Sequence, residues 1–271
     1  MSQESTSEPG GAVVTVDFVR GRNVLLTRAD LSPLFVDYYL HLAEHGIKQA
    51  PEHDRLLKES LAAFALHCAA RPRHEHLAWT INFQEPLVNL FLVGDNDDCT
   101  IAGRVFTENV RVAEHNVFYS DIAAGRVGAV PRRSIVNFEG TDAFRVAEVF
   151  YATSEQRIAR YFDLGEDNFA MLTAHPDCDE KWLRAVDLTG VRALAATEHL
   201  TPIERRSYAW RCGCNQQKIL GTLAAAARED MAAVFGSDES IRVTCPRCAA
   251  SYVITREAME AFLAPRAPGP A

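Results

Sequence analysis

Four cysteines near the C-terminus carry the chemistry that the rest of the chain must position. They form two pairs, Cys212-Gly213-Cys214 and Cys245-Pro246-Arg247-Cys248, and thirty residues separate the pairs. Zinc takes four soft ligands at about 2.3 Å, and two cysteine pairs from separate parts of a small module supply them without leaving a position for water. The spacing therefore predicts a closed tetrahedral Zn²⁺ site and not a hydrolytic centre.

The residues around each pair favour such a site. Pro246 fixes one backbone dihedral and favours a tight turn, so the two neighbouring sulfurs can point at one ion. Gly213 allows the backbone to bend around a metal. Residues 241–244 and 251–254 have strand-like sequences, which predict a hairpin around the second pair.

A short helix, broken once, is predicted between the two pairs. Apolar residues recur there at helical spacing, and Gly236 is a suitable stop. The apolar residues are Ile219, Leu220, Leu223, Ala227, Met231 and Val234.

Local disulfides, or chance cysteines in a small core, are the alternatives to a zinc site. The chain has seven cysteines, an odd number, and its N-terminus lacks the pattern of a signal peptide, so we expect reduced thiols in the cytoplasm. A zinc site of four cysteines is most often a structural staple. Thiolates can also react with oxidants, so the residues of the site leave both roles open.

Length and charge limit the function classes. A chain of 271 residues can form a main domain with a small satellite, and the cysteine module fits the satellite. The formal net charge of −8 argues against binding to nucleic acid. No apolar run approaches the roughly 18 residues that a membrane-spanning helix needs.

The main domain is predicted to be α+β, with a mixed sheet and flanking helices. The acidic cluster of Asp95, Asp97 and Asp98 is interpreted as a solvated turn, and Cys68 as a small buried apolar residue.

No Walker loop, dinucleotide fingerprint, nucleophile elbow or HExxH helix occurs, so we do not expect an enzyme. Strands are expected at 13–19, 77–83, 87–93, 99–106, 116–122 and 133–138, and helices at 32–44, 52–70 and 141–162.

The C-terminal module resembles that of the redox-regulated 33 kDa heat-shock protein family. The resemblance rests on the CxC pair, the amphipathic helix that follows it, and the CxxC pair followed by Tyr252. A second, independent similarity is the aromatic pair Phe150-Tyr151 followed by Ser154-Glu155-Gln156. The chain resembles a divergent member of that family.

This resemblance implies an ATP-independent holdase of the stress response, inactive while reduced and zinc-bound. In that family, oxidants form disulfides between neighbouring cysteines, expel zinc, unfold a linker and expose a surface for unfolding client proteins, often with dimerisation. On this chain the resemblance pairs Cys212 with Cys214 and Cys245 with Cys248. From their polar or proline-rich composition, we expect a disordered tail at 1–11 and a second tail at 265–271. Between them the resemblance implies an α+β client-binding domain (12–175), a linker (176–210) and the zinc module (211–264).

Two further functions stay open from the residues. A zinc-ribbon-like tail with purely structural zinc would bind a protein or nucleic acid. A thiol oxidoreductase would use Cys245 and Cys248, but such a pair normally opens a helix, and this one is predicted to lie between strands. No role is assigned to Cys68, Cys99 or Cys178, although the acidic neighbours of Cys178 should raise its pKa. The linker has room for two short helices, near 180–187 and 191–199.

Overall fold

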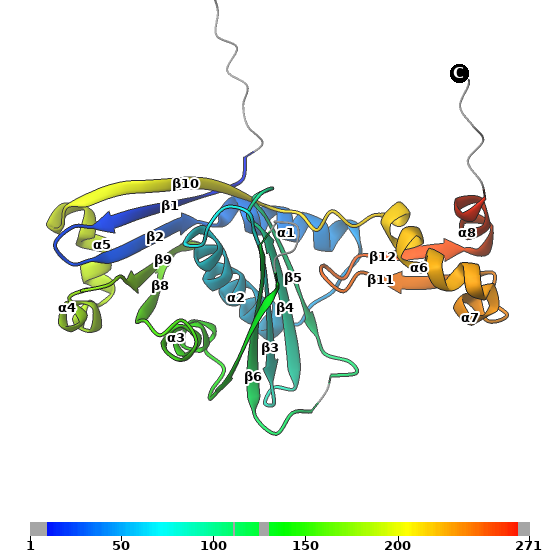
Figure 1. Cartoon of the computed structure of the whole chain (residues 1–271), viewed down its shortest axis with the longest axis horizontal. Coiled ribbons are helices and arrows are strands. Elements are labelled where there is room, and N and C mark those ends of the chain that lie inside the picture. The colour runs from blue at the N-terminus through cyan, green and yellow to red at the C-terminus, as the bar shows by residue number, and fades with distance from the viewer. Residues whose placement is uncertain (1–9, 111, 125–129, 265–271) are drawn as a thin grey trace, which may run out of the picture. The chain divides into compact units, whose positions relative to one another are not determined.

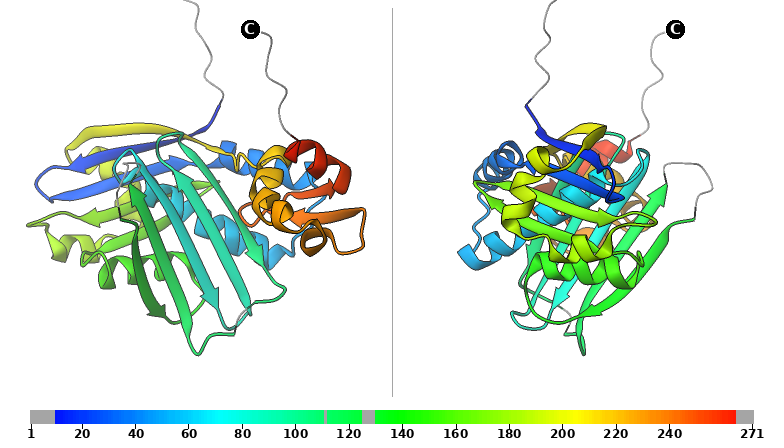
Figure 2. Two further views of the ribbon diagram at one scale, coloured as in Figure 1. Left: turned by 45° about the vertical axis from the view of Figure 1, so that its right-hand side comes forward. Right: turned by 90° about the vertical axis from the view of Figure 1, so that its left-hand side faces the viewer.

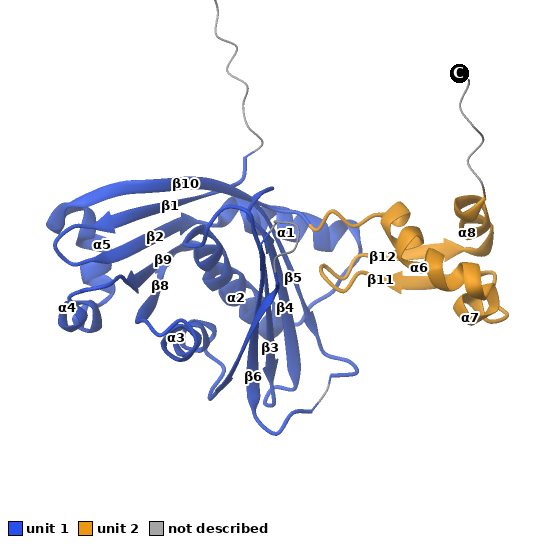
Figure 3. Cartoon of the chain, in the orientation of Figure 1, with its two compact units in different colours: residues 1–211 blue, residues 212–271 orange. Residues whose placement is uncertain are grey.

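The computed structural model describes residues 10–110, 112–124 and 130–264. It is a mixed α+β structure, as the sequence predicts, and it divides into two compact units, residues 1–211 and 212–271 (Figure 3). The finer division into tails, client-binding domain, linker and module remains a prediction. The predicted tails fall outside the described residues, apart from Gly10 and Gly11.

The first unit is built on one large sheet (Figure 1). In the described part of the chain the strand order is β7-β6-β3-β4-β5-β10-β1-β2-β9-β8, and neighbours are antiparallel except β5 and β10. The strands are β1 (Ala12–Val19), β2 (Val24–Asp30), β3 (Glu75–Phe83), β4 (Val88–Asp95), β5 (Thr100–Phe106), β6 (Asn116–Ala124), β7 (Arg132–Phe138), β8 (Ala159–Gly165), β9 (Asn168–Ala174) and β10 (Leu200–Trp210).

Helices α1 (Ser32–Glu44), α2 (Pro51–Ala69), α3 (Ala143–Thr153), α4 (Glu180–Ala185) and α5 (Leu188–Thr197) complete this unit. Helix α2 is the central one, since it contacts strands from both halves of the sheet as well as α3. Its inner side chains Leu57, Leu61 and Phe64 are fully or almost fully buried. None of the helices in the described residues is long and apolar enough to cross a membrane.

Strand β3 shows why the alternating pattern predicts the sheet correctly. Its burial alternates from Leu77 to Phe83, with every second side chain in the core, and Trp79 is among the largest fully buried side chains. Strands β3 to β7 lie side by side as one antiparallel layer (Figure 2). The predicted hairpin between 87–93 and 99–106 is confirmed as β4 and β5.

The helix predicted over 141–162 is wrong in its second half. Helix α3 ends at Thr153, and a hairpin of β8 and β9 follows. Tyr151, Ile158 and Phe162 continue a helical spacing, so the periodicity alone could not show the break. The break is local: Gln156 adopts a positive φ of 54°, which an α-helix does not contain.

Two smaller expectations also differ from the structure. Strand β2 was not predicted, because its Leu-Leu-Thr-Arg-Ala sequence is short and does not alternate. Ser32-Pro33 has the sequence of an N-cap followed by the first helical residue, but Ser32 is already the first residue of α1 and Leu31 is at the N-cap position. The Ser32 hydroxyl donates to Asp30 Oδ1 at 2.7 Å.

The predicted linker residues form α4, α5 and a strand that the sequence did not indicate. The two helices lie close to the predicted positions. The strand, β10, follows them and pairs with β1 along the whole of β1. Its middle reads Glu204-Arg205-Arg206-Ser207, which is too polar to signal an interior strand.

Arg206 explains how such a polar strand is accommodated. Its side chain is 2% exposed, and its guanidinium donates to Glu204 Oε2 at 2.6 Å and to two backbone carbonyls at the end of α2, Cys68 O and Arg71 O. Burial opposes the charge of Arg206, but the bonds to Glu204 and Tyr208 outweigh it and raise its pKa. The same arginine lowers the pKa of Glu204.

The second unit is a small module with its own core. It contains α6 (Gln216–Glu229), α7 (Met231–Phe235), the hairpin of β11 (Ser240–Thr244) and β12 (Ser251–Thr255), and α8 (Arg256–Leu263). The predicted broken helix and hairpin are therefore confirmed. Gly236 ends α7 with a φ of 59°. The core residues are Leu220, Ala227, Phe235, Ile254 and Met259.

We expect Arg206→Met to lower the free energy of unfolding of the first unit by about 2 to 4 kcal/mol, because it removes the buried guanidinium that bonds Glu204, Cys68 O and Arg71 O together. Denaturant unfolding followed by tryptophan fluorescence measures this change. Arg205→Met is the matched control, since Arg205 is exposed on the same strand, and it should change the value by less than about 0.5 kcal/mol. Equal effects of the two substitutions would contradict a structural role for the Arg206 network.

Candidate metal centre

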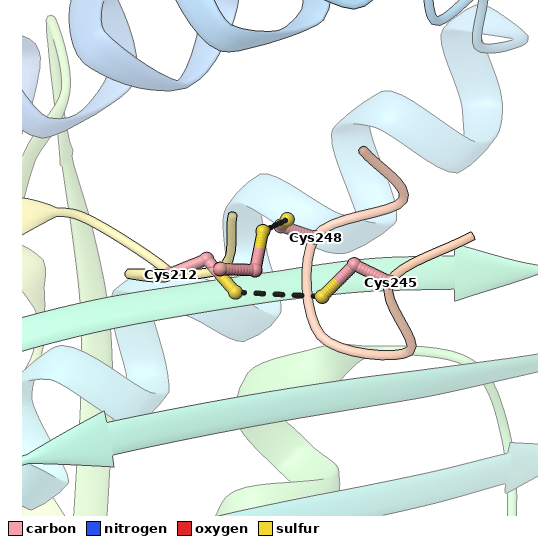
Figure 4. Close-up of side chains that lie close together, drawn as sticks. Cys212, Cys245 and Cys248 are labelled. Atoms are coloured by element: carbon pink, nitrogen blue, oxygen red, sulfur yellow. Dashed lines mark hydrogen bonds between the residues drawn. The ribbon is translucent and has the colours of Figure 1, made fainter. Parts of the chain in front are cut away.

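The structure brings the four predicted cysteine sulfurs of the second unit together. All four lie within 4.8 Å of one another, with Cys212 Sγ 3.6 Å from Cys245 Sγ and Cys214 Sγ 3.5 Å from Cys248 Sγ (Figure 4). A covalent S–S bond is about 2.05 Å, so these contacts are not disulfides. Four sulfurs at 2.3 Å from a tetrahedral ion would be about 3.8 Å apart, and the observed separations are close to that value.

The turn between β11 and β12 positions Cys245 and Cys248. The Cys245 N–H donates to Ala250 O at 2.8 Å, the Ala249 N–H donates back to Cys245 O at 3.0 Å, and Ala249 has a φ of 64°. Both cysteines are almost fully buried, at 3% and 2% exposure. The pair thus lies in a strand-to-strand turn and not at the start of a helix, the position that a thioredoxin-like redox pair occupies.

The segment between β10 and α6 positions Cys212 and Cys214. Gly213 has a φ of 66°, a conformation that favours glycine, so the predicted bend is confirmed. Lys218 Nζ donates to Gly213 O at 2.6 Å, which ties the bend to the first turn of α6. Asn215 caps that helix by accepting from the Lys218 N–H at 2.9 Å.

Hydrogen bonds concentrate negative charge on Cys245. Its pKa is lowered far below the ordinary thiol value, first by the Cys212 thiol and then by Cys248 and the backbone N–H groups of Arg247 and Cys248. The Cys212 thiol donates in this bond and keeps its proton, so the bond to Cys245 raises the pKa of Cys212 to about 12. The hydrogen bonds thus favour a thiolate at Cys245 and a thiol at Cys212 and Cys248, whose pKa values are raised. Thiolate is the form in which cysteine binds metals.

Tyr252 is a supporting residue whose role the sequence did not reveal. Its hydroxyl lies 3.1 Å from Cys214 Sγ and also donates to Cys214 O at 3.1 Å. Burial, followed by the bond to Cys214, raises the pKa of Tyr252. The only sequence signal for this role was the position of Tyr252, four residues after Cys248 on the strand that follows the turn. Together the four cysteines can hold a metal ion, and an all-sulfur donor set suits zinc.

The remaining three cysteines belong to the first unit. Cys68 is fully buried, as predicted, and burial raises its pKa. The pKa of Cys178 is raised, as predicted, although burial is the largest cause and the charges of Glu180 and Asp179 come second. Burial also raises the pKa of Cys99. These shifts make all three thiols less nucleophilic at neutral pH.

The acidic cluster predicted to be a turn is one. Asp95 Oδ1 accepts the backbone N–H groups of Asp97 and Asp98 at 2.9 and 3.1 Å. His76 pairs with Asp95 at 3.1 Å. The charged sequence Arg71-Pro72-Arg73-His74-Glu75-His76 is typical of a loop, but Glu75 and His76 already belong to strand β3. The carboxylate of Asp95 therefore stabilises the turn, which agrees with the predicted structural role of this cluster.

Comparison with known proteins addresses the same region. The Hsp33 family, described as "Hsp33 protein", matches residues 163–255, which include all four clustered cysteines. The resemblance to the Hsp33 family is confirmed. A 33 kDa chaperonin of Nitrosococcus oceani is 24% identical over 154 residues, which cover 49% of this chain and 53% of the relative. The chain thus matches about half the length of that curated relative.

A solved structure extends the likeness in fold to nearly the whole chain. The 33 kDa chaperonin (heat shock protein 33 homolog) of Thermotoga maritima aligns with a TM-score of 0.67 and 14% identity. The alignment covers 94% of this chain and 98% of that one. At this identity the likeness concerns the fold alone.

The aromatic pair Phe150-Tyr151 and the segment Ser154-Glu155-Gln156, the second feature of the sequence resemblance, lie in the first unit at the end of α3 and outside the residues that the family model matches. Phe150 and Tyr151 are fully buried, and the Tyr151 hydroxyl is 2.7 Å from Nδ1 of the buried His67. Burial lowers the pKa of His67 far below its ordinary value, so this imidazole is neutral. Glu155 then pairs with Arg71 at 3.1 Å. The motif therefore fixes the end of α3 against α2.

We expect Tyr252→Phe to weaken zinc binding about tenfold, because the hydroxyl that orients Cys214 is lost while the ring remains. Competition with a chromophoric chelator measures the affinity. Tyr119→Phe, in β6 of the first unit, is the control and should leave the affinity unchanged. An unchanged affinity in Tyr252→Phe would show that the hydroxyl does not support the site.

Proposed function

We propose that this protein is a redox-regulated, ATP-independent chaperone that holds unfolding client proteins after oxidation of a four-cysteine zinc centre. The observation that carries the proposal is the sulfur cluster, which lies inside the segment that matches Hsp33. The names of the two relatives, both 33 kDa chaperonins, support chaperone activity rather than catalysis. The proposed setting is the cytoplasm, where thiols are kept reduced.

In the reduced form, Cys212, Cys214, Cys245 and Cys248 would together hold one Zn²⁺. As ligands of such an ion, the four cysteines would be thiolates, the deprotonated and nucleophilic form. A thiolate attacks peroxide to form a sulfenic acid, and a second thiolate displaces its oxygen to form a disulfide. Each disulfide consumes one peroxide and two protons and releases two waters.

Disulfide formation removes ligands on which the small module depends. Structural zinc stabilises small modules by about 10 to 16 kcal/mol, whereas a core of this size contributes only about 3 to 5 kcal/mol. Loss of the ligands would therefore unfold the second unit. Unfolding exposes the apolar side chains of its core, including Leu220, Phe235 and Ile254, as a surface for clients.

The predicted linker limits how far this unfolding extends. Strand β10 ends at Trp210, two residues before Cys212, and it lies between β5 and β1 in the sheet. Release of β10 would break its backbone hydrogen bonds with β1 and separate the buried Arg206 from its hydrogen-bond partners in the rest of the unit. The sheet therefore resists unfolding beyond the module. Dimerisation after oxidation, which the family resemblance implies, would be driven by the exposed module.

Treatment of the zinc-loaded protein with hypochlorite, or with peroxide at elevated temperature, should release zinc, remove four thiols per chain and suppress aggregation of a thermally unfolding client. A chromophoric zinc indicator, a thiol titration and light scattering measure the three effects on one sample. Cys178→Ser should behave like the wild type, and Cys245→Ser should lose most of its zinc.

Zinc release without client protection would contradict the chaperone and favour a purely structural zinc in a binding module. Salt-dependent binding of the reduced protein to RNA or DNA would further support that alternative. The net charge of −8 argues against it.

We expect the oxidised protein to contain the disulfides Cys212–Cys214 and Cys245–Cys248, the pairing that the family resemblance implies. All four sulfurs lie within 4.8 Å, so the folded cluster permits either pairing, and its closest contacts run across the pairs. Neighbours in sequence remain close once the module unfolds, which favours local disulfides. Peptide mapping by mass spectrometry reads the pairing, and crossed Cys212–Cys245 and Cys214–Cys248 bonds would contradict it.

A further inference from the structure

A second group of metal-ligating side chains lies in the first unit, at the turn between β4 and β5. Among the described residues, two groups of His, Cys, Asp or Glu bring at least three ligand atoms within 4.8 Å of one another. One is the four cysteines of the second unit, and the other is His76, Asp95 and Asp97. This second group offers one imidazole nitrogen and two carboxylate oxygens, a donor set different in kind from the sulfur cluster.

Strand pairing brings His76 and Asp95 together. The two residues lie directly opposite each other in the pairing of β3 with β4, and His76 Nδ1 is 3.1 Å from Asp95 Oδ2. Adjacent nitrogen and oxygen ligands at about 2.1 Å from an octahedral ion are about 3.0 Å apart. One ion therefore fits both atoms without a movement of either strand.

The buried side chain of Asn96, which lies between the two aspartates in sequence, anchors the turn. Its amide donates to Cys68 O and Pro72 O at 2.9 Å each, and its Oδ1 accepts from the Tyr208 hydroxyl at 2.8 Å. The turn is thus fixed to the end of α2 and to β10. The carboxylates on either side of Asn96 do not have to be ordered when an ion binds, and such preorganisation favours affinity.

The turn itself uses only one of the two oxygens of Asp95. Oδ1 accepts the backbone N–H groups of Asp97 and Asp98, whereas Oδ2 is directed at His76. The Asp97 carboxylate is bonded to Nδ1 of His74. A side chain that bonds a ligating carboxylate in this way orients it, so His74 has the position of a supporting residue.

Charge and ligand type both select a divalent transition metal. In the part of the chain that the structure describes, no lysine or arginine pairs with Asp95, Asp97 or Asp98, and the first two contact histidines instead. Three carboxylates without a paired cation attract a positive ion. Imidazole suits Zn²⁺ and Ni²⁺ better than Mg²⁺ or Ca²⁺, which prefer ligands made of oxygen alone.

We propose that His76, Asp95 and Asp97 bind one divalent transition-metal ion of the Zn²⁺, Co²⁺ and Ni²⁺ class. His76 ligates through Nδ1 as the neutral imidazole, with its proton on Nε2. The three side chains are partly exposed, so the ion enters from solvent and keeps water in its other positions. The bound ion joins β3 to the turn after β4. Because its donors are nitrogen and oxygen, an oxidant that removes the clustered thiols leaves them intact.

Calorimetric titration of the reduced, zinc-loaded full chain with Co²⁺ tests this site. Zinc already fills the cysteine cluster, so one further Co²⁺ per chain should bind. Asp97→Asn removes a carboxylate but keeps the size of the side chain, and it should weaken Co²⁺ binding at least about tenfold. His76→Gln, which keeps a donor for Asp95, should weaken it as strongly. His115→Ala, an exposed histidine before β6, is the control and should bind Co²⁺ like the wild type.

A second measurement locates the ion without a variant. Co²⁺ held by cysteine thiolates has intense sulfur-to-cobalt charge-transfer absorption, whereas Co²⁺ held by nitrogen and oxygen has only weak visible bands. The added Co²⁺ should show the weak bands alone. Charge-transfer absorption without them would place it on the cysteines and reject the site.

Two results of the titration would also overturn the proposal: no Co²⁺ bound beyond the zinc already present, or equal affinity of the wild type, Asp97→Asn and His76→Gln. Neither result affects the proposed function, because the two groups of ligands share no residue. Conversely, Co²⁺ binding that both substitutions weaken would stand even if oxidation gave no client protection.

Discussion

Convergence of four cysteine sulfurs is the interaction on which the small C-terminal unit depends. The core around Leu220, Phe235 and Ile254 is too small to stabilise a domain of this length strongly. The cluster joins the chain before α6 to the turn between β11 and β12, and its separations match those around a tetrahedral ion. A module whose folding relies on thiolates is sensitive to any reagent that oxidises them.

The large unit is stabilised in a different way. In the described residues it contains a ten-stranded sheet that packs against α2. The last of these strands in the chain, β10, lies inside the sheet between β5 and β1, and the small unit follows it in sequence. The buried guanidinium of Arg206 joins β10 to the end of α2. The redox regulation proposed above would therefore act on the small unit first, because that unit depends on clustered sulfur and the large one on apolar packing and a buried ion pair.

The end of α3 connects the family-like motif to the surface of the large unit. Phe150 and Tyr151 pack in the core beside the neutral His67, Glu155 anchors to Arg71, and Gln156 is exposed. One short segment thus contains buried residues, Phe150 and Tyr151, followed by the exposed Gln156. The buried pair and the Glu155–Arg71 ion pair fix the backbone immediately before Gln156.

Sequence alone determined the parts that depend on local patterns. Cysteine spacing, proline and glycine predicted that the four sulfurs meet, and alternating or continuous apolar segments predicted β3 to β7, because both signals lie within a few residues. The tertiary structure alone decided the rest. Strand β10 is polar in sequence and is stabilised by Glu204 and the distant α2 carbonyls. The helical spacing through Phe162 concealed the break at Gln156. The support of Cys214 by Tyr252 arises from a contact between residues far apart in the chain, which no local pattern contains.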